Sequence, residues 1–360
     1  MIATLYFFVL AICFVCVFFN NQSRIVALIG TVAAFIIFAG NNSNSDYNLY
    51  LFSLMTDDYD RYEKGYQWYY NLYKSIGITD YQTTVIITFC LLGIIIYFTM
   101  KKITKNYCMV IFFLIIAELF IETVQIRMMI ASVFIFVAVY MYSVNKRKIA
   151  LLFSVFSCLF QMSGAFFIPF FIAGMVKREK KQISEKSKYQ FIIGFFAVYL
   201  ILLLCNNLLN INLPLLVIST VGKRFSILKQ ASFYFGGTSW GSVQFVVLYF
   251  VNLLSVCFIK HNTPEDSVFG EAVENINMYA ALSLPFLFVD MNFYRFFRIL
   301  NLSNFVFFAS AFEFRKRNVL TVKNLQMLAV LCASQICWVI SYVIRVPEIY
   351  TDIFSNNIWS

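Results

Sequence analysis

Histidine is nearly absent from this chain, because His261 is the only one among 360 residues. Catalysis by a serine-histidine-aspartate triad and a metal centre built from several histidines are therefore almost excluded by count alone. The sequence also has no glycine-rich phosphate loop and no metal-ligand spacing. We therefore expect neither a metal nor a cofactor.

Charged residues are scarce as well. They make up 13% of the chain, hydrophobic residues make up 61%, and the mean hydropathy is +0.76. A soluble domain is about half apolar and about a quarter charged, so this composition indicates an integral membrane protein. Repeated apolar runs of about 20 residues favour helices over a barrel, whose strands have about ten residues. We predict an all-α polytopic membrane protein that forms a single integral membrane domain over residues 1–360.

The nine cysteines lie in or beside apolar stretches, which gives no disulfide framework. Cys13 and Cys16 have the spacing of a redox or metal pair, but they sit inside the first hydrophobic run with no histidine or acidic neighbour. We therefore expect no redox or metal chemistry from them.

Basic residues outnumber acidic ones by 28 to 18, which gives a net charge of +10. They lie in short clusters between apolar runs, as the positive-inside bias predicts, so nucleic acid is a poor candidate partner. Lys101, Lys102 and Lys105 belong in the cytoplasm by this bias, which puts the preceding loop, residues 41–82, outside the cell. A second external loop is expected at 206–242.

The apolar runs predict about 11 or 12 passes with both termini outside. The expected single spans are Ile2–Phe19, Ile25–Ala39, Thr83–Met100, Tyr107–Ile121, Met128–Tyr142, Tyr189–Cys205, Val243–Ile259, Ile276–Val289, Ile299–Phe312 and Leu325–Ile344. A polar linker is expected at Lys260–Glu274. The run Ile149–Val176 is followed by six cations, so a single pass would place them outside. We predict a re-entrant or short hairpin there, broken near Gln161–Gly164.

The first external loop interleaves carboxylates and tyrosines, including Asp46, Tyr47, Tyr50 and Glu63. Ring faces cover the apolar side of a sugar and carboxylates accept hydrogen bonds from its hydroxyls, so this loop is a candidate saccharide site. The alternative is that these rings are there because tyrosine favours the headgroup region.

Acidic residues also lie in a span, where an ionised group costs several kcal/mol unless it is paired or faces water. Glu118, Glu122 and Gln125 share one helical face by their spacing. Glu122 is thus a functional candidate; the alternative is a Glu122–Arg127 ion pair that closes a short external turn.

Five cations are expected at the outer surface, where guanidinium groups bind phosphate oxygens in a bidentate manner. They are Arg127, Lys223, Arg224, Arg295 and Arg298. A lipid diphosphate that carries a sugar chain fits these cations together with the nearby carboxylates. The alternative for Arg295 and Arg298 is that they reach lipid headgroups from a helix end.

Several short motifs occur in a recognisable order. They are Asp46-Tyr47-Asn48-Leu49-Tyr50, Tyr62-Glu63-Lys64-Gly65-Tyr66, Ile126-Arg127-Met128-Met129-Ile130-Ala131, Phe160-Gln161-Met162-Ser163, and the stretch with Arg295 and Arg298. In order and spacing they resemble the EpsG-type branch of the Wzy-like polysaccharide polymerases. The family commonly has histidine in the position of Gln161, and glutamine keeps the hydrogen bonding but cannot carry a proton.

The resemblance implies a metal-independent membrane glycosyltransferase in the bacterial cell membrane. Such an enzyme joins lipid-linked oligosaccharide repeat units into capsular or exopolysaccharide as polyprenyl diphosphate leaves, and works in the bilayer beside other polysaccharide-assembly proteins. Arg127, Arg295 and Arg298 would hold the diphosphate, and Asp46 or Glu63 would be the general base. Lys223, Arg224, Tyr47, Tyr50, Glu122 and Gln161 complete the expected binding residues. A flippase for the same lipid and a polysaccharide ligase are the alternatives.

Overall fold

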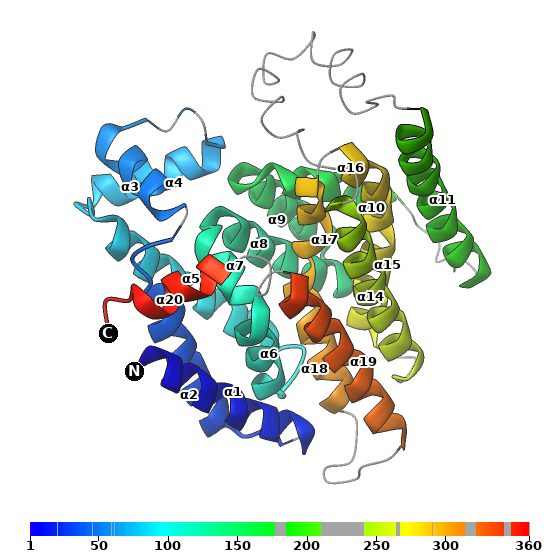
Figure 1. Ribbon diagram of the computed structural model, residues 1–360, viewed down its shortest axis with the longest axis horizontal. Coiled ribbons are helices and arrows are strands. Elements are labelled where there is room, and N and C mark those ends of the chain that lie inside the picture. Colours follow the sequence, from blue (N-terminus) through cyan, green and yellow to red (C-terminus); the bar gives the residue numbers. More distant parts are fainter. Residues whose placement is uncertain are drawn as a thin grey trace.

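The computed structural model describes residues 1–19, 21–44, 46–58, 60, 62–176, 185–209, 241–263, 267–289, 291–313, 322–341 and 347–359. This part of the chain is built from helices and contains no β-strand (Figure 1). The first half has α1 (Ile2–Phe18), α2 (Arg24–Ala34), η1 (Phe35–Ala39), α3 (Tyr47–Thr56), α4 (Lys64–Ser75), α5 (Tyr81–Met100), α6 (Tyr107–Phe113), η2 (Leu114–Glu118), α7 (Leu119–Val124), α8 (Ile126–Ser143), α9 (Arg147–Phe160), η3 (Met162–Phe167) and α10 (Ile168–Val176). The second half has α11 (Glu185–Leu209), α14 (Gly241–His261), α15 (Val268–Tyr279), η5 (Ala280–Ser283), α16 (Leu284–Val289), η6 (Met291–Tyr294), α17 (Arg295–Arg298), α18 (Asn301–Glu313), α19 (Val322–Val339) and α20 (Pro347–Ser355).

Four described helical stretches are long and apolar enough to cross a membrane, namely Tyr81–Met100, Tyr107–Val124, Ile126–Ser143 and Val243–His261. Shorter apolar helical stretches cover Ile2–Phe18, Arg24–Ala39, Met162–Met175, Gln190–Cys205 and Asn324–Val339. Each of these coincides with a predicted span or hairpin arm, and the all-α polytopic membrane architecture is confirmed. The total number of passes and the single-domain organisation stay predictions.

The predicted hairpin is broken where expected. Helix α9 ends at Phe160, and Gln161 adopts an extended backbone with φ −149° and ψ 123°. A 3₁₀ turn, η3, follows, and the backbone N–H of Gly164 donates to the Gln161 carbonyl at 2.9 Å. A Cβ at Gly164 would lie 2.4 Å from Ser157 Oγ and 2.8 Å from the Cys158 nitrogen, so the turn back onto α9 requires glycine here.

Among the described residues, connections with basic residues gather at one end of the bundle, which we call the basic end. Thr104 Oγ1 and the Lys105 backbone N–H both donate to the carboxylate of Glu313, at 2.9 and 2.7 Å. A small cavity at the same end is lined by Lys102, Ser143 and Ser267, among others. Helix α8 runs from Ser143 at this end to Ile126, about 27 Å away at 1.5 Å per residue. Arg127 therefore lies at the opposite end.

The polar loop at 41–82 folds into two short helices, α3 and α4, which lie at the upper left of Figure 1. Helix α4 packs on the end of α9 through Gly65, where a Cβ would lie 2.5 Å from the Leu159 carbonyl oxygen. The C-terminal helix α20 is tied to the start of the loop, because Asn41 Nδ2 donates to the carbonyls of Asp352 and Asn356 at 3.2 and 3.0 Å. These contacts tie the start of the loop to α20 and its second helix to α9.

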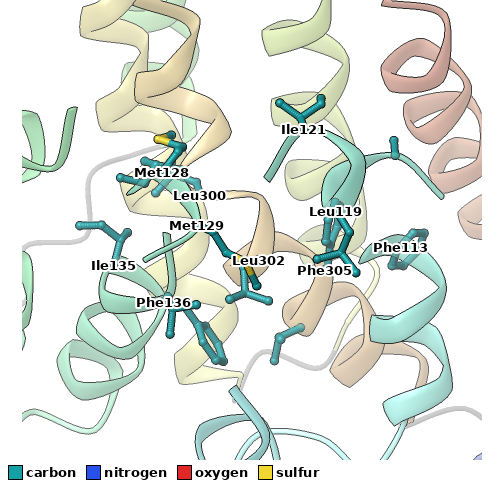
Figure 2. Close-up of a cluster of buried hydrophobic side chains, with 14 of the residues drawn as sticks. Phe113, Leu119, Ile121, Met128, Met129, Ile135, Phe136, Leu300, Leu302 and Phe305 are labelled. Atoms are coloured by element: carbon teal, nitrogen blue, oxygen red, sulfur yellow. The ribbon is translucent and has the colours of Figure 1, made fainter. Parts of the chain in front are cut away.

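The bundle core lies where α6, α7, α8 and α18 meet (Figure 2). Figure 2 shows Met128, at the start of α8, close to Leu300, which precedes α18, and Phe305 close to Leu119. Phe113 and Phe305 stack with ring centroids 5.3 Å apart. This core holds the first turn of α8, with Arg127, beside the turn that carries Arg298.

The structure corrects one of the predicted connections and leaves most of another undescribed. The polar linker predicted at Lys260–Glu274 is too long, because α15 begins at Val268, where Ser267 caps the helix by accepting from the Gly270 N–H at 3.1 Å. Glu274 is buried in that helix, with 6% of its surface exposed. Most of the predicted second loop, 206–242, lies outside the described residues.

Candidate functional site

Arg127 joins three of the predicted site segments. It lies in the first turn of α8 and forms an ion pair with Glu63, the residue that precedes α4. Its Nε donates to the Tyr50 hydroxyl at 3.1 Å, and its guanidinium lies 5.0 Å from the ring centroid of Tyr62. The other oxygen of Glu63 accepts from the backbone N–H of Met162 at 3.3 Å, directly after Gln161. The loop, α8 and the hairpin break therefore meet at one ion pair.

This ion pair is partly accessible, since the Arg127 and Glu63 side chains are 22% and 18% exposed. A guanidinium held on one edge by a tyrosine and a carboxylate keeps further N–H donors for a ligand. Burial raises the pKa of Tyr50 to about 12, and Arg127 opposes that rise. The Tyr50 hydroxyl therefore keeps its proton while it accepts from Arg127, and it can donate to a second group.

Asp46 lies one helical turn before Tyr50 and is within electrostatic range of Arg127 and Arg295. Burial raises the pKa of its carboxyl above the usual range, and the positive charges of Arg127 and Arg295 oppose the rise. Asp46 directly precedes α3, and its backbone N–H donates to Asn44 Oδ1 at 3.1 Å. A half-buried carboxylate with a raised pKa is better matched to general base work than an ordinary surface aspartate.

Arg295 opens the four-residue helix α17, which packs against η3 and so lies near the hairpin break. It is within electrostatic range of both Asp46 and Glu122. Its side chain is half-buried, and its buried Nε has no hydrogen-bond partner among the described residues. Arg295 thus brings positive charge to the site, and its guanidinium is not fully used for hydrogen bonds within the described structure.

Arg298 lies one turn further along and is fully buried. Its Nη2 is 3.0 Å from Glu122 Oε1, its Nε is 3.8 Å from Glu118 Oε1, and its Nη1 donates to the Tyr294 hydroxyl at 2.9 Å. Asn301 Nδ2 donates to Glu118 Oε2 at 2.8 Å. The alternative that Arg298 reaches lipid headgroups is wrong, because its guanidinium is enclosed by the bundle. The alternative Glu122–Arg127 pair is also wrong, because Gln125 breaks the helix and the two side chains take different partners.

The tyrosines of the loop pack mainly against one another. Tyr50, Tyr62 and Tyr66 are at most 6% exposed, and the Tyr50 and Tyr62 ring centroids are 5.5 Å apart. Tyr47 is partly exposed and packs edge-on against Tyr81 at 4.8 Å. The ring faces expected to cover a sugar are therefore largely buried in a packed cluster of tyrosines. Of these tyrosines, Tyr47 stays partly exposed.

The structure brings most of the predicted residues to the end of the bundle opposite the basic end. Asp46, Tyr50, Glu63, Arg127 and Arg295 form one group, and Glu122 with Arg298 forms a buried second group beneath Arg295. Gln161 is buried at the hairpin break, next to the residue that donates to Glu63. Lys223 and Arg224 lie outside the described residues.

Two polar partners of the second group were not predicted. Tyr294 and Asn301 lie four residues before and three residues after Arg298, so helical spacing around that arginine is the signal that finds them. No group of three or more histidine, cysteine, aspartate or glutamate side chains that could hold a metal ion occurs in the part of the chain that the structure describes.

Comparison with known proteins agrees with the motifs. The model of the EpsG family matches residues 25–347, which is most of the chain. The chain belongs to the EpsG family. The resemblance inferred from the motifs is thereby confirmed, and membership of this family of Wzy-like polysaccharide polymerase-type proteins points to a polymerase-like role in polysaccharide biosynthesis. No curated protein and no solved structure matches the chain significantly.

Proposed function

We propose that this EpsG-family protein polymerises polyprenyl-diphosphate-linked oligosaccharide repeat units into capsular or exopolysaccharide. The reaction takes place at the outer face of a bacterial cell membrane, with the basic end in the cytoplasm. The observation that carries the proposal is that Arg127 meets Glu63 and Tyr50 of the loop at the end of the bundle where α17 brings Arg295. Asp46 lies one helical turn before Tyr50 and within electrostatic range of both arginines. A base beside two guanidinium groups is what glycosyl transfer from a diphosphate requires.

In the proposed reaction, Asp46 takes the proton from a hydroxyl of the acceptor unit. The hydroxyl oxygen forms a bond to the anomeric carbon of the donor chain, and the bond from that carbon to the diphosphate oxygen breaks. Polyprenyl diphosphate leaves with the electron pair, so negative charge grows on its oxygens. Cations already in place favour that step because they need no reorganisation as the charge develops.

In this reaction the two accessible arginines, Arg295 and Arg127, have different roles. Arg295 supplies a fork of N–H donors to the diphosphate from its partly exposed guanidinium. Arg127 adds a second positive charge, oriented by Glu63 and Tyr50. Glu63 is committed to this pair and to Met162, which leaves Asp46 as the base. Arg298 and Glu122 hold the turn that carries Arg295, and they do not touch the substrate.

The test uses purified protein in lipid nanodiscs with its lipid-linked repeat unit, scored for a ladder of products. Wild-type protein makes the ladder. Arg295→Lys keeps the charge but removes the fork, and it slows the ladder about tenfold or more, as expected for one good bidentate contact. Arg24→Lys is the matched control, because Arg24 is exposed at the start of α2, near the basic end. A wild-type ladder from Arg295→Lys contradicts bidentate phosphate binding.

A deletion strain separates the proposed activity from its alternatives. Single lipid-linked repeat units accumulate on the outer leaflet if the protein is the polymerase. Accumulation on the inner leaflet identifies a flippase, and long lipid-linked polymer identifies a ligase; either result refutes the proposed activity.

A further inference from the structure

Glu118 and Glu122 place two carboxyl groups around one buried guanidinium. Their side chains are 6% and 4% exposed, and the side chain of Arg298 is 0% exposed. The two glutamates are four residues apart in one helical stretch, so their side chains lie on the same face of the helix. Neither carboxyl is at a surface where water could compensate its charge.

The charges of this cluster do not balance if both carboxyls are ionised. Glu122 has the short contact to Arg298, at 3.0 Å, whereas Glu118 is 3.8 Å from the same guanidinium. Arg295 is the second cation within range, but it also faces Asp46. Tyr294 and Asn301, the other hydrogen-bond partners named for this cluster, are uncharged. A buried carboxylate without a full countercharge is costly and is relieved most easily by taking up a proton.

The hydrogen bonds indicate where that proton lies. Glu118 Oε2 accepts from Asn301 at 2.8 Å, which leaves Oε1 to carry a hydrogen. Glu122 Oε1 accepts from Arg298, while Glu122 Oε2 is buried and has no donor among the described residues. A protonated carboxyl has one O–H donor, and a proton on Glu118 Oε1 supplies the donor that Glu122 Oε2 lacks.

We propose that Glu118 and Glu122 form a proton-binding site that holds one proton between them, resident on Glu118. The ionised Glu122 then pairs with Arg298, and the cluster is neutral inside the bundle. Arg298 and Arg295 are on the same turn of α17, so the protonated pair also fixes the position of Arg295. The proton site stands on its own geometry; only its effect on Arg295 rests on the proposed function.

Infrared spectroscopy of the purified protein at neutral pH tests the site directly. Wild-type protein shows the carbonyl band of a protonated carboxyl, sensitive to deuterium exchange, and Glu118→Gln removes that band. Glutamine at 118 offers both an acceptor for Asn301 and an N–H donor for Glu122, so Glu118→Gln melts within a few degrees of wild type. Glu122→Gln leaves Arg298 without its ion partner and melts several degrees lower.

Other outcomes overturn the assignment. If the wild-type spectrum lacks the band, or Glu118→Gln leaves it unchanged, Glu118 does not hold the proton. If Glu118→Gln melts as low as Glu122→Gln, Glu118 is an ionised partner of Arg298. The infrared measurement needs no substrate and no folded Glu122 variant, so it is independent of glycosyl transfer. A wild-type protein that shows the band but makes no ladder would refute the proposed function alone.

Discussion

Gly65 packs the loop that carries Glu63 closely against the hairpin that carries Gln161. A Cβ at this position would lie 2.5 Å from the Leu159 carbonyl oxygen, 2.7 Å from its Cβ and 2.8 Å from its carbonyl carbon. The first distance is about 0.9 Å short of the 3.4 Å at which ordinary contact begins. Two of the three atoms belong to the backbone, so no side-chain rotation relieves the clash. In Gly65→Ala, α4 must move away from α9.

The expected cost follows from the size of this overlap. Inserting a methyl group into a well-packed contact typically costs about 1 to 3 kcal/mol. Since 1.4 kcal/mol is a factor of ten, this is about a 5- to 140-fold shift in the equilibrium between docked and undocked α4. Glu63 directly precedes α4, so undocking separates it from Arg127 and from the Met162 N–H. We expect the rate of polymer formation to fall by a similar factor.

Thermal unfolding in detergent and the polymerisation ladder measure the two effects. Gly93→Ala in α5 is the matched control, because a Cβ there meets nothing within 4 Å. Alanine is also the better helix former, so that control should be neutral or slightly stabilising, by up to about 1 kcal/mol. If Gly65→Ala has the melting temperature and the product ladder of wild type, the close packing of α4 on α9 does not hold Glu63 in place.

Two further predictions concern the polar groups of the site. Because burial raises the pKa of Asp46, its carboxylate should be protonated at higher pH than an exposed aspartate with its pKa of about 3.9. As the pH is lowered, the rate of polymer formation should therefore begin to fall at a pH above about 3.9. Asp46→Asn should lower that rate by about 10²- to 10⁴-fold and abolish its pH dependence. An unchanged pH profile in that variant would show that another group is the base. Tyr50→Phe keeps the ring but removes the hydrogen bond to Arg127. A hydrogen bond with a charged donor is worth about 1.5 to 3 kcal/mol, so we expect the product ladder to form at least tenfold more slowly. Tyr70→Phe, which loses a hydroxyl contact to Tyr66 at 3.0 Å, should be close to wild type, and equal losses in both variants would count against a role for the Tyr50–Arg127 bond.

The helices of the bundle could be predicted because their cause is local. An apolar run of about 20 residues can satisfy its backbone in lipid only as a helix. Most predicted spans accordingly match observed helices within a few residues, and the break at Gln161 follows from charge and length. The predicted span Ile276–Val289 is an exception, because α15 begins at Val268 and a 3₁₀ turn, Ala280–Ser283, separates it from α16. Helix α20 and the short helices α3 and α4 were not predicted, because they are short and lie outside the long apolar runs on which the prediction of helices rested.

The pairing of charges could be predicted only in part. The order of the spans and the basic connections predicts that the cations and carboxylates of the site gather at the end of the bundle opposite the basic end. Which carboxylate meets which arginine does not follow, since Glu63 and Arg127 are 64 residues apart and Glu122 and Arg298 are 176 apart. Helices such as α5 are apolar on every side, so their sequence does not say which face turns inward.

By itself, the sequence determined that this chain folds as helices in a membrane, with its basic connections at one end, because hydrophobic run length and charge bias act along the chain. The tertiary structure alone decided that Arg127 is paired at an accessible site while Arg298 is sealed in the core with two carboxyls. Side-chain packing between distant segments sets those environments, and the burial of a charge depends on its neighbours in space.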